Sequence, residues 1–225
     1  CQKTSLLFNS HRLTTNSINS KLSIFEALKT DSFISGLSRS LLFKKGKVKE
    51  LLYQVIQLGI NGVQYINEFP PHIARDIYKS NGLNKNSKIL DPCAGWGGRM
   101  IGASVISDNY FGFDPSIKTY NGLVLLNDFI KTMNPDFSSV LNKTPFEDSE
   151  LQNNFFDFAL TSPPYYNTEN YSNEKNNSQN RYKNFNEWCN YFYLPLIEKT
   201  MYSLKINSTF VLNIGSRKYP LNEVL

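Results

Sequence analysis

The sequence predicts an α/β protein with a mostly parallel sheet covered by helices on both faces, and a helical region N-terminal to it. Short apolar runs of strand length alternate with longer stretches of helical spacing over residues 88–218. Strands that alternate with helices need crossover connections, and such connections produce a parallel sheet between two helical layers. Residues 24–66, in contrast, repeat apolar side chains at helical spacings alone. With 225 residues, the chain is long enough for one such core and a small helical annex.

We therefore expect an N-terminal helical region at residues 1–68 and the α/β domain at residues 69–225. The stretch "VKELLYQVIQLGI" at 48–60 places its apolar residues on one broad helical face. The lysines around its start indicate either a solvated helix end or a patch that contacts phosphates, and the first is the simpler interpretation. At the start of the domain, "NEFPPHIARDIYKSNGL" predicts a helix opened by proline and closed near Gly82.

The α/β domain is predicted to contain five strands and three further helices. The strands are predicted at residues 88–92, 110–115, within 138–148, 155–164 and 208–218, and the helices at 97–106, 116–133 and 187–204. Residues 168–186 are polar, rich in asparagine and too long for an ordinary connection. We expect either a functional lid or a disordered excursion there.

Composition narrows the class of protein. The chain carries 24 Lys and Arg against 19 Asp and Glu, a net charge of +5, which weakly favours a polyanionic partner. Its three cysteines show none of the paired spacings of a zinc site or a disulfide framework, so no metal site is predicted. No apolar run approaches the roughly 20 residues that cross a bilayer, and no secretory signal is recognisable. We expect an intracellular, cytoplasmic protein and, because the first residue is Cys1, a chain that lacks an N-terminal stretch.

A glycine-rich loop after the first predicted strand is the first feature that points to chemistry. In "KILDPCAGWGGRM", Asp91 and Pro92 end the strand, and the glycines let the backbone turn tightly beside a ligand. Asp114 ends the second strand, where a carboxylate can accept hydrogen bonds from both hydroxyls of a ribose. Together they predict a nucleoside-bearing cofactor. Because no lysine with serine or threonine follows the glycines, ATP is disfavoured. A glycine-rich turn and an ordinary strand-terminal aspartate are the alternative.

"DPCAGWGG" followed by "TSPPY" resembles two motifs of the amino-methyltransferases that use S-adenosylmethionine, D-P-F-x-G-x-G and [DNS]-P-P-[YFW]. The resemblance covers roughly residues 69–216 and implies a Rossmann-like methyltransferase fold with S-adenosyl-L-methionine as cofactor. Cys93 stands where the family usually has phenylalanine, and Trp96 adds bulk among the glycines. Because this fold usually continues with an antiparallel hairpin, we expect either a domain truncated at its C-terminus or an abbreviated enzyme. The cofactor-binding residues that the resemblance implies are Phe69, Pro70, Asp91, Pro92, Cys93, Ala94, Gly95, Asp114, Pro115, Phe146 and Glu147.

The second motif ends the fourth predicted strand, because proline cannot donate to a sheet ladder. An exocyclic amino group is a poor nucleophile, since its lone pair is delocalised into the ring, and it needs acceptors that draw it toward tetrahedral geometry. Ser162 offers a side-chain oxygen and Pro163 a backbone carbonyl, while Tyr165 offers a flat face for a base removed from its stack. The predicted catalytic residues are Ser162, Pro163, Pro164 and Tyr165. A rigid turn without catalytic role is the alternative.

The residues that follow resemble a subgroup of bacterial and phage DNA methylases, which implies a protein of a bacterial or phage-infected cell. That subgroup has an acid and an aromatic residue after S-P-P-Y, then Q-x-R-Y and a tryptophan. The matching residues here are Glu169, Tyr171, Arg181, Tyr182 and Trp188. For substrate binding the resemblance implies Tyr166, Glu169, Tyr171 and Arg181, the last through a phosphate. A solvated loop, with Trp188 packed in the next helix, is an equally good interpretation.

The resemblance implies methyl transfer from S-adenosylmethionine to an exocyclic amino nitrogen of a base in DNA. Serine at the head of the second motif is more typical of members that methylate N4 of cytosine than of those that methylate N6 of adenine. Cytosine is therefore favoured, and adenine stays open. The alternatives are an RNA base amino-methyltransferase of the same fold and a catalytically silent subunit that binds nucleic acid. The expected partner is DNA with a flipped base, or RNA; a restriction partner or second subunit is left open, and no membrane partner is expected.

Overall fold

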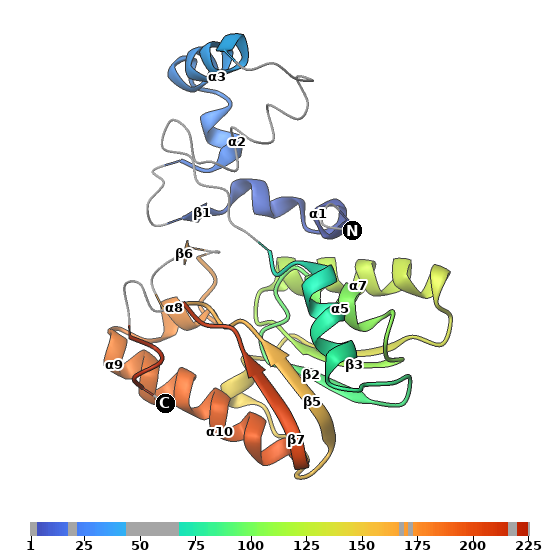
Figure 1. Cartoon of the computed structure of the whole chain (residues 1–225). Coiled ribbons are helices and arrows are strands. Elements are labelled where there is room, and N and C mark those ends of the chain that lie inside the picture. The colour runs from blue at the N-terminus through green and yellow to red at the C-terminus, as the bar shows by residue number, and fades with distance from the viewer. Residues whose placement is uncertain are drawn as a thin grey trace. The chain divides into compact units, whose positions relative to one another are not determined.

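The computed structural model describes residues 4–17, 22–43, 68–166, 169–170, 173–215 and 220–224 (Figure 1). The chain divides into two compact units. The sheet unit comprises residues 1–9, 68–166 and 173–225, and the small unit comprises residues 10–67 and 167–172. The helix predicted at 48–60, the lysines around its start, and Tyr171 lie outside the described residues.

The sheet unit is built on a five-stranded sheet in which every neighbouring pair is parallel. Its strands are β2 (Lys88–Asp91), β3 (Asn109–Phe113), β4 (Ser138–Asn142), β5 (Phe156–Thr161) and β7 (Leu204–Leu212). In space they follow the order β4-β3-β2-β5-β7 (Figure 1). The chain runs from β2 to one edge and then from β5 to the other, which is the doubly wound arrangement of a Rossmann-like fold. The predicted α/β fold with a parallel sheet is confirmed.

Alternate side chains of the central strands enter two different cores, because successive residues of a strand point to opposite faces. Ile89 of β2 and Phe158 of β5 pack with α5, α6 and α7. Leu90 and Ala159, one position later in each strand, pack with α9, η4 and α10 on the other face (Figure 1). Burial on both faces explains why the strands read as continuous apolar runs. The helices are α5 (Pro71–Ser80), α6 (Gly98–Ala103), α7 (Ile117–Met133), α9 (Phe185–Trp188), the π-helix η4 (Cys189–Tyr193) and α10 (Leu194–Ser203).

Local signals set the ends of α5, α6 and α7. α5 begins at Pro71, and the chain leaves it through Gly82, which adopts a left-handed φ of +72°. The proline-opened helix predicted from the sequence is therefore confirmed. α6 follows Gly97, whose φ of +90° favours glycine. α7 is capped by Ser116, whose hydroxyl accepts the N–H of Thr119 at 3.4 Å.

The last helical stretch and the last strand begin earlier than predicted. The helix predicted at 187–204 starts at Phe185 and contains the π-helical segment η4. Trp188, at the end of α9, is fully buried among aromatic side chains, a tertiary constraint that sequence spacing does not reveal. Leu204 is the first residue of β7, where it pairs with Phe156, so the fifth strand begins four residues before the predicted Ser208.

The polar stretch predicted as a lid or a disordered excursion is partly folded. Its residues 173–186 belong to the sheet unit and include the short helix α8 (Ser178–Arg181). Trp188 anchors that helix, because its indole Nε1 donates to Ser178 Oγ at 3.2 Å. Asn177 and Ser178 are buried. For these residues the disordered alternative is wrong, since a buried tryptophan and its hydrogen bond hold them in place.

The small unit contains two short strands that pair antiparallel, with Ser17 opposite Glu169. Ser23 and Glu26 form a capping box at the start of α2, in which each side chain accepts the backbone N–H of the other residue. Its described elements are η1 (Ser10–Thr14), β1 (Asn16–Ser17), α2 (Ile24–Ala27), α3 (Asp31–Phe43) and β6 (Glu169–Asn170).

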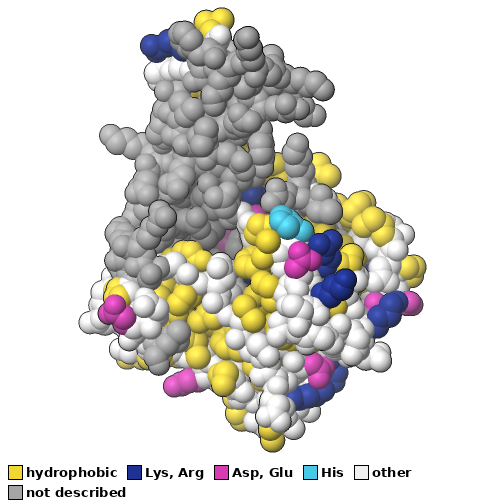
Figure 2. All heavy atoms as spheres, viewed as in Figure 1, with side chains coloured by type: hydrophobic (Ala, Val, Ile, Leu, Met, Phe, Trp, Pro, Cys, Tyr) yellow, Lys and Arg dark blue, Asp and Glu magenta, His cyan; other side chains and the backbone are white. Residues whose placement is uncertain are grey.

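None of the helices in the described part of the chain has the length and apolar character needed to cross a bilayer. Nor does that part bring three or more His, Cys, Asp or Glu side chains together as a possible metal site. On the face shown in Figure 2, its Lys and Arg side chains are interspersed with Asp and Glu. The excess of positive charge therefore forms no single basic patch among the described residues of that face.

Candidate active site

The two motifs meet at the carboxyl edge of the sheet. β2 leads into the glycine loop, residues 91–98, and its neighbour β5 leads into the SPPY loop, residues 162–166. From β2 the chain winds toward β3 and β4, whereas from β5 it winds toward β7 on the other side. This is the topological switch point, where open α/β sheets bind their ligands.

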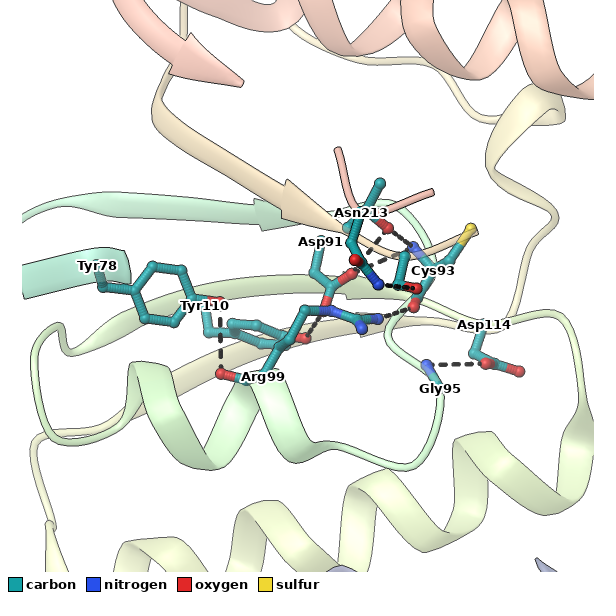
Figure 3. A network of polar contacts seen from close by, with 10 residues as sticks. Tyr78, Asp91, Cys93, Gly95, Arg99, Tyr110, Asp114 and Asn213 are labelled. Atoms are coloured by element: carbon teal, nitrogen blue, oxygen red, sulfur yellow. Dashed lines mark hydrogen bonds and ion pairs between the residues drawn. The ribbon is translucent and has the colours of Figure 1, made fainter. Parts of the chain in front are cut away.

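Asp91, at the end of β2, is fully buried and forms the centre of a hydrogen-bond network (Figure 3). Its Oδ2 accepts bonds from Arg99 Nε at 2.8 Å and Tyr110 Oη at 2.6 Å. Its Oδ1 accepts bonds from Thr161 Oγ1 at 3.2 Å and from the N–H of Cys93 at 3.3 Å. A carboxylate with four protein donors and no accessible surface has little left to offer a ligand. Asp91 therefore holds the glycine loop against β3 and β5.

Arg99 is the buried cation of this network. Its Nη2 donates to the carbonyl of Cys93, and its own carbonyl accepts from Tyr78 Oη at 3.4 Å. Burial acts to lower the pKa of Arg99, but the charge of Asp91, its hydrogen bond to the guanidinium, and Tyr110 and Tyr78 together raise it. Burial raises the pKa of Tyr78 and Tyr110 well above the ordinary value, and Asp91 adds to this effect. The same causes raise the pKa of the Cys93 thiol, so Cys93 is protonated at neutral pH.

Asp114, just after β3, has a different environment from Asp91 because it is only half-buried. Its Oδ2 accepts the N–H of Gly95 at 3.1 Å, and its Oδ1 accepts the N–H of Ser116 at 3.0 Å (Figure 3). Gly95 makes its contact in a left-handed conformation, with φ of +55°. Burial raises the pKa of Asp114 to about 7, with the two N–H groups opposing it and the charges of Asp91 and Glu174 adding to it. The carboxylate keeps lone pairs for further donors.

Phe69 borders the glycine loop. The guanidinium of Arg99 lies 5.4 Å from the centre of the Phe69 ring. Gly98 approaches the Phe69 carbonyl so closely that a Cβ at this glycine would lie 2.2 Å from the oxygen. Pro70 is the residue just before α5. Of the other predicted cofactor residues in this region, Pro92 and Ala94 are buried, and Cys93, Gly95 and Pro115 are half-buried.

Phe146 and Glu147 lie in the short helix η3 (Phe146–Asp148) after β4. The Phe146 ring is buried and packs edge-on against Phe113 at 5.0 Å between centroids. Glu147 Oε1 accepts a bond from Arg181 Nη1 at 2.9 Å. The same guanidinium binds both carboxylate oxygens of Asp148, at 2.8 and 3.0 Å. Arg181, predicted to pair with a phosphate, is thus engaged by two carboxylates of the protein itself.

In the SPPY loop, Ser162 Oγ and Tyr165 Oη lie 3.2 Å apart. Pro163 is buried and Pro164 is half-buried. Both hydroxyls also lie 3.0 Å from the Nδ2 of Asn213, a residue absent from the predicted site. Asn213 lies inside the last predicted strand, 208–218, whereas β7 ends at Leu212 and leaves Asn213 at the edge of the sheet. Figure 3 places Asn213 at the same end of the sheet as Asp91 and Cys93.

The other predicted substrate residues have different positions. Tyr166, with φ of +51°, places its ring edge-on against Phe185 at 5.4 Å and Trp188 at 5.8 Å between centroids. It therefore belongs to the aromatic core below α9. Glu169 lies in β6 of the small unit. Tyr171 lies outside the described residues.

The N-terminal segment also supports the glycine loop. α1 (Thr4–Phe8) belongs to the sheet unit, although the predicted N-terminal region includes it. The Phe8 ring packs against Phe129 of α7 at 5.4 Å between centroids. Asn9, which is fully buried, donates from Nδ2 to the carbonyl of Trp96 at 3.1 Å. A residue far upstream in the sequence therefore fixes the middle of the glycine loop.

Residues 67–205, more than half of the chain, match the family model described as N-6 DNA methylase. This region contains both motifs, four of the five parallel strands in full, and the helices of both faces. No curated protein matches the sequence.

Several solved structures resemble the chain at low identity. The YcgJ protein from Bacillus subtilis is 13% identical with a TM-score of 0.45, over 68% of this chain and 55% of that chain. An S-adenosylmethionine-dependent O-methyltransferase from Thermotoga maritima is 9% identical with a TM-score of 0.49, over 71% of this chain and 49% of that chain. An rRNA methylase from Streptococcus thermophilus is 13% identical with a TM-score of 0.44, over 71% of this chain and 78% of that chain. The chain thus spans about half the length of the first two structures.

Proposed function

The chain belongs to the N-6 DNA methylase family, and from this membership we propose that it transfers a methyl group from S-adenosylmethionine to an exocyclic amino nitrogen of a base in DNA. One observation carries the proposal. The glycine loop and the SPPY loop follow the adjacent strands β2 and β5 at the switch point of the sheet. A cofactor at the first loop and a base at the second would face each other across one crevice, as direct transfer between them requires.

The donors and acceptors of the first loop fit S-adenosylmethionine. Asp114 is half-buried and keeps lone pairs for ribose hydroxyls after accepting the N–H groups of Gly95 and Ser116. When bound, the cofactor supplies a methyl group made electrophilic by its sulfonium. Asp91 and Arg99 are proposed to act indirectly, because both are buried and hold the loop through hydrogen bonds to the backbone of Cys93. The residues proposed to line the cofactor are Phe69, Pro70, Cys93, Gly95, Asp114 and Pro115, with Phe146 and Glu147 on the adenine side.

The SPPY loop supports the chemistry at the base. Ser162 Oγ and the Pro163 carbonyl are proposed to accept the two hydrogens of the amino group, which concentrates its lone pair on nitrogen and aims it at the methyl carbon. Pro164 keeps the loop rigid, and the Tyr165 ring is proposed to stack on the flipped base. The pKa of Cys93 is raised by burial, so this thiol is poorly suited to act as a nucleophile and the proposal uses no covalent intermediate.

Two observations bear on the target base and point in different directions. The family is described as N-6 DNA methylase, which favours N6 of adenine. Ser162 at the head of the second motif favours N4 of cytosine. We place adenine first, because the family match rests on more than half of the chain and the cytosine argument rests on one side chain.

The substrate side is proposed in part from the sequence alone. Glu169 and Tyr171 keep their predicted role in substrate binding. Tyr166 is proposed to support the loop through its aromatic contacts rather than to touch the base. Arg181 is proposed to hold α8 to η3 rather than to contact DNA. The division into an N-terminal region (1–68) and a transferase domain (69–225) also remains a proposal.

Mass spectrometry of nucleosides tests the function. Unmethylated DNA is incubated with the protein and S-adenosylmethionine whose methyl group is deuterated, and the digested nucleosides are analysed. Labelled N6-methyladenine is expected. Labelled N4-methylcytosine would restore the cytosine assignment, and transfer to RNA in direct competition would identify the RNA enzyme. Absence of methyl transfer, together with absence of cofactor binding in calorimetry, would indicate a silent subunit.

A further inference from the structure

Asn213 comes beside the SPPY loop through the register of two strands. Thr161, the last residue of β5, pairs with Leu212, the last residue of β7. The ladder continues one step further, because the N–H of Asn213 donates to the carbonyl of Thr161 at 2.9 Å. Each strand's next residue, Ser162 or Asn213, therefore stands at the same level of the sheet edge.

The side chain of Asn213 joins both hydroxyls of the SPPY loop. Its Nδ2 lies 3.0 Å from Ser162 Oγ and 3.0 Å from Tyr165 Oη. Tyr165 Oη also donates to the backbone carbonyl of Asn213 at 3.3 Å. Gly215, two residues later, borders the same ring, since a Cβ there would lie 3.3 Å from Tyr165 Cε2. The segment after β7 thus contacts the tyrosine at its hydroxyl and along its edge.

These groups are accessible to solvent, so their contacts with one another are not needed to provide partners for buried polar atoms. Asn213 is exposed, and Ser162 and Tyr165 are half-buried. Water could satisfy polar groups with this much exposure, so folding does not require them to bond to one another. Their convergence on one amide instead links both side chains to the segment after β7.

Counting hydrogens gives the consequence of this arrangement. The two N–H bonds of Nδ2 are used by Ser162 Oγ and Tyr165 Oη. Either hydroxyl can donate in the contact between them, and when Tyr165 gives its one proton to the backbone carbonyl of Asn213, Ser162 is the donor. Ser162 Oγ has then accepted one bond and donated one. A single lone pair remains, and a serine that could have acted as donor or acceptor is left as an acceptor only.

We propose that Asn213 is a positioning residue, which makes Ser162 a hydrogen-bond acceptor for the amino group and holds the Tyr165 ring in place. The inference rests on the proposed function, since it gives Asn213 a role in that reaction. It acts through its two partners and does not touch the reacting atoms.

Kinetics of full-chain variants test the role. Asn213→Ala is expected to lower kcat by about 10- to 100-fold, with the calorimetric affinity for S-adenosylmethionine and the Tm unchanged. Asn213→Leu keeps the size of the side chain without its donors, and it should lose as much. If the leucine variant retains full activity, packing explains the residue and the inference is overturned. Asn153→Ala is the matched control, because Asn153 is another exposed asparagine, bonded to the Tyr202 carbonyl at 3.0 Å, and its loss should leave kcat unchanged.

Removing both hydroxyls tests whether Asn213 acts only through Ser162 and Tyr165. In the Ser162→Ala, Tyr165→Phe background, Asn213→Ala should add less than about a threefold further loss, because Nδ2 has no hydroxyl left to position. A further tenfold loss would contradict the inference.

The contact can also be read without any turnover. In protein labelled with ¹⁵N-asparagine, the Asn213 side-chain amide resonance, identified by its absence in Asn213→Ala, should shift in Ser162→Ala and in Tyr165→Phe. An unshifted resonance would overturn the inference even in an active enzyme. A shifted resonance in a protein that transfers no methyl group would instead reject the proposed function and leave the contact intact.

Discussion

Arg181 and Glu147 form an ion pair in which Nη1 and Oε1 lie 2.9 Å apart, with the Glu147 side chain 4% exposed. Arg181 ends α8 and Glu147 lies in η3, so the pair ties the segment after the SPPY loop to the loop after β4. The second carboxylate, Asp148, binds the same guanidinium through both oxygens. Two segments far apart in the sequence are thereby joined beside the proposed adenine side of the site.

Arg181→Ala should destabilise the protein by about 2 kcal/mol, because it leaves a nearly buried carboxylate without its cation while the partly exposed arginine itself loses little packing. Arg75→Ala is the control: Arg75 pairs with Asp76 on the surface, where both side chains are at least half exposed, and should cost less than about 0.5 kcal/mol. Urea unfolding measures both. If Arg181→Ala instead keeps full stability and reduces the salt dependence of DNA binding, the arginine contacts a phosphate as first predicted.

The affinity for S-adenosylmethionine should fall as the pH drops below about 7, the value to which burial raises the pKa of Asp114. Ribose hydroxyls donate to the carboxylate, so only its ionised form offers two acceptor oxygens, and protonation opposes binding. Below the pKa the affinity should approach a tenfold loss for each pH unit. Calorimetry between pH 5.5 and 8.5 gives the curve.

Asp114→Asn supplies the control for this titration. The amide cannot ionise, so the variant should bind the cofactor more weakly at pH 8 and show a flat response between pH 6 and 8. A wild-type curve that is equally flat would mean that Asp114 does not bind the ribose in its ionised form.

The two strand-end aspartates should respond differently to the same substitution. Asp91→Asn leaves Arg99, with 5% side-chain exposure, as a buried cation without its carboxylate, and should cost about 3–5 kcal/mol of unfolding free energy. Asp114→Asn should change stability far less, because Asp114 is half-buried and pairs with backbone N–H groups. Chemical unfolding compares them. Should Asp91→Asn prove as stable as wild type and lose only cofactor affinity, Asp91 would be a direct ligand.

Tyr165→Ala should lower kcat/KM for DNA by about 5- to 150-fold, the range of one lost base–aromatic stack, and leave cofactor affinity unchanged. Tyr165→Phe keeps the ring and loses the hydroxyl that Asn213 contacts, so its loss should be smaller. Steady-state kinetics on one DNA substrate separates the two. Equal losses in both variants would show that the hydroxyl, and not the ring face, matters at this position.

The alternation of apolar runs was enough to predict the parallel sheet, because strands buried on both faces leave a strong signal. It also placed Asp91 and Asp114 at strand ends. It could not distinguish them, since Arg99 and Tyr110, which bury the charge of Asp91, come from other elements and reveal their direction only in three dimensions.

The same limit applies to the segment after the SPPY loop. Its composition suggests solvent exposure, yet one buried indole at Trp188 holds α8 through Ser178. Arg181 looked like a phosphate ligand because the carboxylates that engage it lie more than thirty residues earlier in the chain. Asn213 was missed because the last strand was predicted to run to residue 218, whereas β7 ends at Leu212.

The contact of Asn9 with Trp96 has a practical consequence for protein engineering. A fragment that begins at residue 67, where the family match begins, and keeps the rest of the chain would retain both motifs and the whole sheet, but its glycine loop would lose the amide that binds the Trp96 carbonyl, and Phe129 would lose its ring partner Phe8. Without Phe8, the face of α7 around Phe129 becomes exposed, so the trimmed protein is expected to be less soluble than the full chain. A synthetic peptide that carries residues 4–9, added in trans, should then complement it in cofactor binding.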